Sequence, residues 1–234
     1  MLFMPITPTK FSVQVNETDA VTAMLYPASK KNRAGITLIL GHGAGANQSS
    51  GFMRLFANGL AERGLDVMTF NFVYSERGRG GPDPKAKLEA CYGAAINAAA
   101  SQKTLKGNKI AIGGKSMGGR IGSQVAAADS SRISALVFLG YPLHPPGNLE
   151  KMRDAHLPDI KAPMLFLQGS RDTFGTTAEL RAVIKKHKLP ATLYEIQGGD
   201  HSFKVPKSAG LTQDQVYEQT MDEIARWLQA NCKT

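Results

Sequence analysis

Cysteine is scarce in this sequence of 234 residues. The two cysteines, Cys91 and Cys232, lie far apart, and each falls within a helical pattern. This spacing indicates neither a disulfide framework nor a metal-ligand cluster. We expect both to be packed or partly exposed thiols, and no metal or cofactor is predicted.

Long hydrophobic runs are also missing. No segment approaches the roughly 20 apolar residues needed to cross a bilayer. The opening "MLFMPITPTK" has no basic flank and contains two prolines, so it does not resemble a signal peptide. We therefore expect a cytoplasmic protein with no membrane partner.

What is present fits an ordinary globular chain: 42% of residues are hydrophobic and 20% are charged. The length suits one α/β domain spanning residues 1–234. The net charge is +9, but the bases form short groups ("KKNR", "RGRG", "KKHK") without interleaved aromatics. This pattern favours a solvated basic surface over a nucleic-acid interface.

Short apolar runs indicate the fold. Two alternating stretches, 11–15 and 20–26, flank the turn-forming "NETD" and predict an antiparallel hairpin. Six further runs alternate with helical segments: 36–40, 66–72, 109–112, 135–140, 163–168 and 191–196. Buried strands separated by helices predict a mostly parallel central sheet with helices on both faces.

Two helices can be predicted in more detail. In "DPKAKLEACYGAAINAAASQK" the apolar residues recur at helical spacing, with Asp83 as the expected N-cap and Pro84 at the first helical position. Near the end of the chain, Tyr217, Met221 and Ile224 share one stripe. This last helix should pack against the sheet.

The stretch "GGKSMGGR" (113–120) follows the predicted strand 109–112. A phosphate-binding Walker A loop would need glycine at position 109, which is Lys109, so that interpretation is excluded. The residues instead match G-x-S-x-G, in which a strained strand-to-helix turn exposes a nucleophilic serine. Small residues on both sides let the strand and helix approach closely, so Ser116 is the candidate nucleophile.

A nucleophilic serine needs a base and an orienting carboxylate. Asp172 follows the predicted strand 163–168, and His201 follows the strand 191–196. Both therefore belong at the carboxyl edge of the sheet, where open α/β sheets form their sites. Asp200 is a weaker candidate, because a carboxylate adjacent to His201 in sequence cannot easily turn onto that ring.

The charge that develops on a substrate carbonyl oxygen also needs donors. One should be the backbone N–H of Met117, directly after the serine, and another should come from "GHGAGA" (41–46). We predict Ala44 for this second donor, with Gly45 as the alternative. His42 is expected to fix this loop.

The remaining histidines give weaker signals. His144 follows a strand end and could line the pocket. His187 should lie at a helix C-terminus, and His156 has no partner that the sequence identifies.

Three arginines could contribute to substrate recognition. Arg120 follows the serine by four positions, while Arg77 and Arg79 lie in "NFVYSERGRGGP". Arg77 or Arg79 could bind an anionic group, although a solvated loop is the alternative.

Together these motifs resemble the α/β-hydrolase superfamily over roughly residues 34–230. "GHGAGA", "NFVY", "GGKSMGGR", "GYPLHPPG", "LFLQGSRDTFG" and "GGDHSF" are similar to a dienelactone-hydrolase-like branch that includes testis-expressed hydrolase-like proteins and the hydrolase-like subunit of the NSL chromatin complex. Dienelactone hydrolases use a cysteine nucleophile where this chain has Ser116. The likeness to the chromatin subunit implies that the scaffold can also serve in protein assembly.

Many superfamily members insert a cap before the strand predicted at 163–168. Here residues 141–162 leave no room for a cap domain, which predicts an open site suited to short or polar esters. The sequence thus predicts a serine hydrolase acting on a small-molecule ester or related acyl bond. The alternatives are a thioesterase or peptidase with the same triad, and a non-catalytic interaction protein. The sequence leaves the oligomeric state open.

Overall fold

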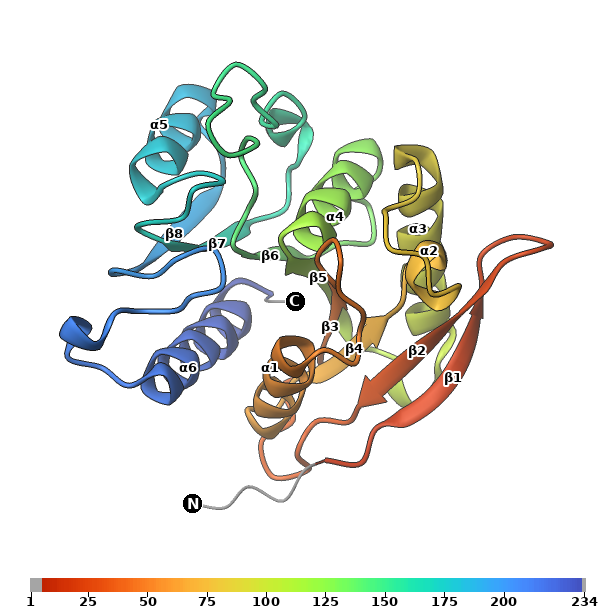
Figure 1. The fold of residues 1–234 in the computed structure, drawn as a ribbon. Coiled ribbons are helices and arrows are strands. Elements are labelled where there is room, and N and C mark those ends of the chain that lie inside the picture. Colours follow the sequence, from red (N-terminus) through yellow and green to blue (C-terminus); the bar gives the residue numbers. More distant parts are fainter. Residues whose placement is uncertain (1–5, 233–234) are drawn as a thin grey trace.

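The computed structural model describes residues 6–232. Its sheet has eight strands in the order β1-β2-β4-β3-β5-β6-β7-β8 (Figure 1). In chain order these are β1 (Thr9–Gln14), β2 (Ala20–Tyr26), β3 (Ile36–Gly41), β4 (Asp66–Phe70), β5 (Lys109–Lys115), β6 (Ala135–Leu139), β7 (Met164–Gly169) and β8 (Ala191–Ile196). Residues 1–5 lie outside the described residues. They form the first half of the opening segment whose sequence does not resemble a signal peptide.

The strand directions follow the prediction. β1 pairs antiparallel with β2, and β2 pairs antiparallel with β4. Every other pairing in the sheet is parallel. The mostly parallel sheet and the N-terminal hairpin are therefore confirmed, with the first strand two residues earlier than predicted.

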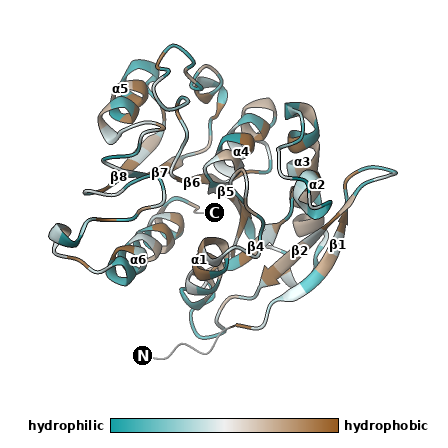
Figure 2. Ribbon diagram, viewed as in Figure 1, coloured by the Kyte–Doolittle hydropathy of each residue, from teal (hydrophilic) through white to brown (hydrophobic). Residues whose placement is uncertain are grey.

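Helices cover both faces of the sheet, as expected. They are α1 (Gly51–Glu62), α2 (Val73–Glu76), α3 (Lys85–Ser101), α4 (Met117–Ala128), α5 (Thr177–His187) and α6 (Gln213–Asn231), with short 3-10 turns η1 (Lys103–Leu105), η2 (Leu157–Asp159) and η3 (Lys207–Ala209). α1 and α6 lie on one face, and α3, α4 and α5 lie on the other (Figure 1). Each face buries its own apolar layer, and the central strands are mostly hydrophobic (Figure 2).

The start of α3 differs from the prediction. The helix begins at Lys85 with Pro84 at the N-cap position, so Asp83 is not the cap. The Asp83 carboxylate instead accepts a hydrogen bond from the Tyr74 N–H (2.7 Å) and pairs with Arg79 (2.9 Å). A buried carboxylate is stabilised more by a charged partner and a backbone N–H than by capping a helix, whose free N–H groups can bond to water instead.

The segment between β6 and β7 contains only the short turn η2, so no cap domain forms there within the described residues. None of the helices in residues 6–232 is both long and apolar enough to cross a membrane.

Both cysteines are free and buried. Burial raises the pKa of the Cys91 thiol to about 12 and that of Cys232 to about 11. Neither thiol is therefore ionised to a useful extent near neutral pH.

Candidate active site

Ser116 occupies a sharp turn between β5 and α4. The strand continues past the predicted residues 109–112 to Lys115, because the glycines after Ile112 still pair with both neighbouring strands. Ser116 then has φ 51° and ψ −115° before α4 begins at Met117. A non-glycine residue rarely adopts this conformation, and the surrounding structure must hold it in place.

Close backbone contact explains the glycines on either side. A Cβ added at Gly114 or at Gly118 would overlap the carbonyl oxygen of Gly41 at the end of β3. Gly114 also has φ +148°, which disfavours any side chain. The turn that presents Ser116 therefore lies directly against the end of β3.

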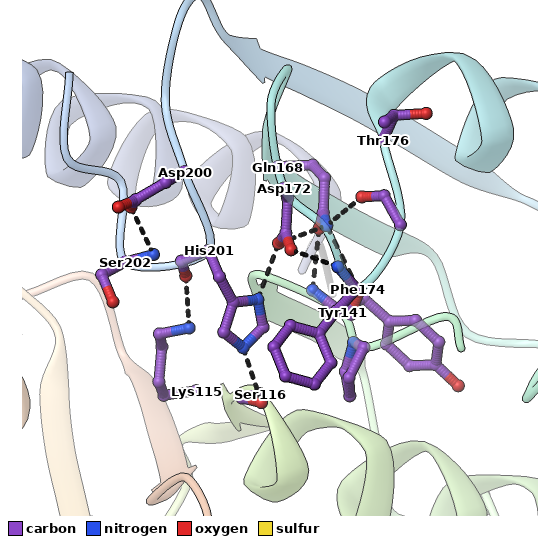
Figure 3. Close-up of polar contacts among 12 residues, drawn as sticks. Lys115, Ser116, Tyr141, Gln168, Asp172, Phe174, Thr176, Asp200, His201 and Ser202 are labelled. Atoms are coloured by element: carbon purple, nitrogen blue, oxygen red, sulfur yellow. Dashed lines mark hydrogen bonds and ion pairs between the residues drawn. The ribbon is translucent and has the colours of Figure 1, made fainter. Parts of the chain in front are cut away.

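The structure brings the three predicted side chains together (Figure 3). Ser116 Oγ lies 2.8 Å from His201 Nε2, and His201 Nδ1 lies 2.7 Å from Asp172 Oδ2. Because a carboxylate only accepts, Nδ1 carries the proton and Nε2 of the neutral ring can accept the serine hydroxyl proton. The three residues follow β5, β8 and β7, at the carboxyl edge of the sheet.

Asp172 is completely buried and accepts three hydrogen bonds. The donors are His201, the Gln168 side-chain amide (2.8 Å) and the Phe174 N–H (2.8 Å). Gln168 also accepts from the Tyr141 N–H (2.8 Å). The sequence did not predict a role for Gln168, whose only signal was a polar side chain in an otherwise apolar strand.

Asp200, the weaker carboxylate candidate, is occupied elsewhere. Its Oδ1 accepts the N–H groups of Ser202 (2.7 Å) and Lys204 (2.9 Å). It thereby caps the turn that carries His201.

The loop after β3 lies beside the serine. A Cβ added at Gly43 would be 3.7 Å from the Ser116 Cβ. Ala44 and Met117 both line the cleft at Ser116, whereas Gly45 does not. Within residues 6–232, neither the Ala44 N–H nor the Met117 N–H donates a hydrogen bond, so both can serve an incoming oxygen.

His42 holds this loop in place. The ring is fully buried; Nδ1–H donates to the Gly43 carbonyl (2.9 Å), and Nε2 accepts from the Phe72 N–H (3.1 Å). Burial lowers the pKa of His42 to about 4. The ring is therefore a neutral link between the loop and Phe72, and it does not line the cleft at Ser116.

Lys115 is a second feature that the sequence did not predict. Its Nζ donates to the His201 carbonyl (2.6 Å) and lies 5.8 Å and 5.7 Å from the ring centroids of Phe52 and Phe203. Burial lowers the pKa of Lys115 to about 8, and the carboxylates of Asp172 and Asp200 partly oppose this. Lys115 thus ties the β5 turn to the loop that carries His201 (Figure 3).

A cleft of about 700 Å³ opens above Ser116 and His201. Arg120 lines it, as the sequence suggested, and so does Arg153, for which the sequence gave no signal. Arg77 and Arg79 do not line it; they pair with Asp19 and Asp83. The expectation that either binds an anionic group at the site is therefore corrected: both already have buried carboxylate partners.

The remaining histidines lie outside this cleft. His144 is buried with Nε2 3.4 Å from Glu179, so the expectation that it lines the pocket is wrong. His187 ends α5, as predicted, and bonds to Asp154 (3.0 Å). His156 lies 2.7 Å from the Ser123 hydroxyl, a partner that the sequence did not identify.

No group of three or more His, Cys, Asp or Glu side chains in the described part of the chain is placed to hold a metal ion.

The strand order, and the turn after β5 that carries a serine into a helix, are those of the α/β-hydrolase fold. The chain belongs to the alpha/beta hydrolase domain family, which it matches over residues 34–229. This membership supports hydrolase activity in general.

Solved structures agree on the fold. A dienelactone hydrolase from Anabaena variabilis is 20% identical, with a TM-score of 0.73 over 97% of this chain and 99% of that chain. An alpha-beta serine hydrolase homologue from Coxiella burnetii is 18% identical, with a TM-score of 0.70 over 95% and 96% of the two chains. A serine hydrolase without lid from Xanthomonas campestris is 16% identical, with a TM-score of 0.70 over 96% of each.

Proposed function

We propose that this protein is a serine hydrolase that cleaves a carboxylic ester through an acyl-enzyme intermediate. The observation that carries the proposal is the pair of hydrogen bonds from Ser116 Oγ to His201 Nε2 and from His201 Nδ1 to Asp172. The uncovered cleft and the family membership support it.

The first half of the reaction transfers the acyl group to the enzyme. Ser116 Oγ attacks the ester carbonyl carbon while His201 Nε2 takes the hydroxyl proton. The N–H groups of Ala44 and Met117 donate to the oxyanion, and Asp172 stabilises the imidazolium. The carbon–oxygen bond to the alcohol then breaks, and His201 returns its proton to the departing oxygen.

Water completes the cycle. His201 takes a proton from a water molecule, whose oxygen attacks the acyl carbon. The bond to Ser116 Oγ breaks, Oγ recovers the proton from His201, and the carboxylic acid leaves. This chemistry needs no cofactor or metal.

The decisive experiment compares wild type with Ser116→Ala. Wild type should react covalently with a fluorophosphonate probe at neutral pH and hydrolyse p-nitrophenyl acetate, and the variant should do neither. Removing the nucleophile should lower kcat by about 10⁴-fold or more. Thermal unfolding of both proteins controls for loss of the fold.

Folded wild-type protein without Ser116-dependent labelling would overturn the proposal and favour a non-catalytic interaction protein. If labelling depends on Ser116, matched ester, thioester and anilide substrates would separate an esterase from a thioesterase or peptidase, since the same three residues serve all of them. An uncovered cleft should favour short acyl chains over long ones in a series of p-nitrophenyl esters.

A small-molecule substrate and a cytoplasmic location belong to the same proposal. Among the narrower resemblances, a dienelactone hydrolase is one of the structural neighbours. The likeness to testis-expressed proteins and to the NSL subunit rests on the sequence motifs and stays a prediction.

A further inference from the structure

The cleft above Ser116 is lined by an excess of positive charge. Its cationic side chains are Lys85, Lys115, Arg120, Arg153 and Lys204, against a single carboxylate, Asp83. Asp83 already accepts from the Tyr74 N–H and pairs with Arg79. Lys85 pairs with Glu89 (3.5 Å), but the other four cations form no ion pair within residues 6–232, so the cleft presents positive charge to an incoming ligand.

Arg120 lies one helical turn beyond the serine. Its N–H donates to the Ser116 carbonyl (3.1 Å), and both side chains line the cleft. Ser116 directly precedes α4 and Arg120 lies in its first turn, so two residues close together in the chain contribute to the same cleft.

Arg153 reaches the cleft from the segment between β6 and β7. Its N–H donates to the Leu143 carbonyl (2.8 Å), and Nη1 donates to the Pro142 carbonyl (3.2 Å). The Tyr141 hydroxyl in turn donates to the Arg153 carbonyl (2.8 Å). These three bonds hold the backbone and the guanidinium of Arg153 at the rim of the site.

Neither arginine has an acidic partner within residues 6–232, although both are partly buried. Burial lowers the pKa of Arg153, and the positive charge of Arg120 lowers it further. Two half-buried guanidinium groups that repel each other gain most from a shared anion, because charge-assisted bonds to arginine are strong and specific.

We propose that the substrate of Ser116 carries an anionic oxygen group, a carboxylate or a phosphate, that binds between Arg120 and Arg153. This inference rests on the proposed serine hydrolase function and names its substrate class. The ester carbonyl faces Ser116 and the oxyanion donors, while a short linker spans the distance to the two guanidinium groups. The positive cleft also attracts such a substrate from solution.

The test uses esters that differ in one charge. p-Nitrophenyl hydrogen adipate carries a terminal carboxylate, and methyl p-nitrophenyl adipate is its neutral counterpart. Wild type should show a kcat/KM about 10-fold or more higher for the anionic ester. Arg120→Gln and Arg153→Gln should each lower this preference by about 10-fold or more.

Arg132→Gln is the matched control. Arg132 is exposed, bonds to Asn97 (2.9 Å) and does not line the cleft, so its loss should leave the preference unchanged. A third ester, which ends in a phosphonate, separates the two anions. Whichever anionic ester has the larger kcat/KM relative to the neutral ester identifies the group that the site takes. Thermal unfolding checks that each variant is folded.

The outcomes separate the two proposals. Ser116-dependent hydrolysis without any preference for either anion, or with a preference that both arginine variants retain, overturns the anionic substrate and leaves the hydrolase standing. Wild type that turns over none of the three esters and shows no Ser116-dependent labelling by the fluorophosphonate probe overturns the hydrolase, whereas labelling without turnover of any of the three esters overturns the anionic substrate alone. Calorimetry reads the anion site separately: methyl hydrogen adipate should bind Ser116→Ala about 10-fold more tightly than dimethyl adipate, and equal affinities would overturn the site.

Discussion

At the scale of single residues, Asp172 shows how a buried charge is accommodated. It is completely inaccessible, yet each carboxylate oxygen has a donor: Phe174 on one, Gln168 and His201 on the other. Such a carboxylate is rigid and fully satisfied. It can therefore hold the His201 ring in a single orientation.

Replacing this carboxylate should affect catalysis far more than binding. Asp172→Asn should lower kcat by about 10³- to 10⁴-fold with little change in KM, because the amide no longer fixes the productive tautomer of His201. Steady-state hydrolysis of p-nitrophenyl acetate measures both constants.

Asp200→Asn is the control for Asp172→Asn. In the described part of the chain, the Asp200 carboxylate bonds only to the backbone of its own turn, so kcat should fall by less than about 10-fold. An equal loss in the two variants would make Asp200 the orienting carboxylate and contradict our assignment.

The sequence predicted some of these residues and not others. Ser116, Asp172 and His201 could be found because each follows an apolar strand within a turn-forming motif. Gln168 and Arg153 could not, because a side chain's partners depend on how separate segments pack. Arg77 and Arg79 were misjudged for the same reason: their partners, Asp19 and Asp83, meet them only in the folded chain.

At the scale of elements, the approach of α4 to the end of β3 governs the geometry of the site. Gly118→Ala places a methyl group on the Gly41 carbonyl oxygen. The free energy of unfolding should fall by about 2–3 kcal/mol, since backbone that cannot give way has to shift. kcat should fall too, because the shift moves Ser116.

Gly93→Ala provides a matched helix substitution. Gly93 lies within α3 with open space where a Cβ would be, so alanine should stabilise the protein by about 0.5–1 kcal/mol. Urea unfolding of both variants gives the comparison. If the Gly118→Ala protein were as stable as wild type, α4 could move away from the end of β3 without loss of stability, which would contradict the prediction.

Periodicity predicted the elements better than their ends. The run "KIAI" predicted β5 but not its last residues. The glycines that follow are typical of a turn in sequence, and only their pairing with two neighbouring strands places them in β5. Asp83 resembled an N-cap, yet a more distant backbone donor and Arg79 compete for its carboxylate.

At the scale of the whole molecule, two neutral histidines, one buried and one partly buried, link stability to acid pH. Burial lowers the pKa of His42 to about 4; burial, with the nearby charges of Lys85 and Arg120, lowers that of His156 to about 4. The unfolded chain takes up these protons below about pH 6.5. Their stabilising contribution is therefore complete above pH 6.5 and is lost as the pH falls towards 4.

For His42, the difference between pH 7 and pH 4.5 should be about 2 kcal/mol. His42→Gln should remove this part of the pH dependence while leaving the part due to the carboxylates. Urea unfolding of wild type and variant at both pH values measures it. Equal pH dependence in the two proteins would contradict a neutral His42.

The fold class followed from the alternation of short buried strands with helices, which is a property of the whole chain and tolerates local errors. The single domain over residues 1–234 stays a prediction. The charge of the cleft could not be predicted, because a net charge of +9 does not reveal which cations are paired and which face the site.

The burial of both cysteines has a practical consequence for spectroscopy. With the Cys91 and Cys232 thiols protonated and shielded, a cysteine introduced at the cleft rim, for example Lys204→Cys, would be the thiol that a maleimide reagent reaches. A fluorophore or spin label could therefore be attached beside the site without first removing the native cysteines.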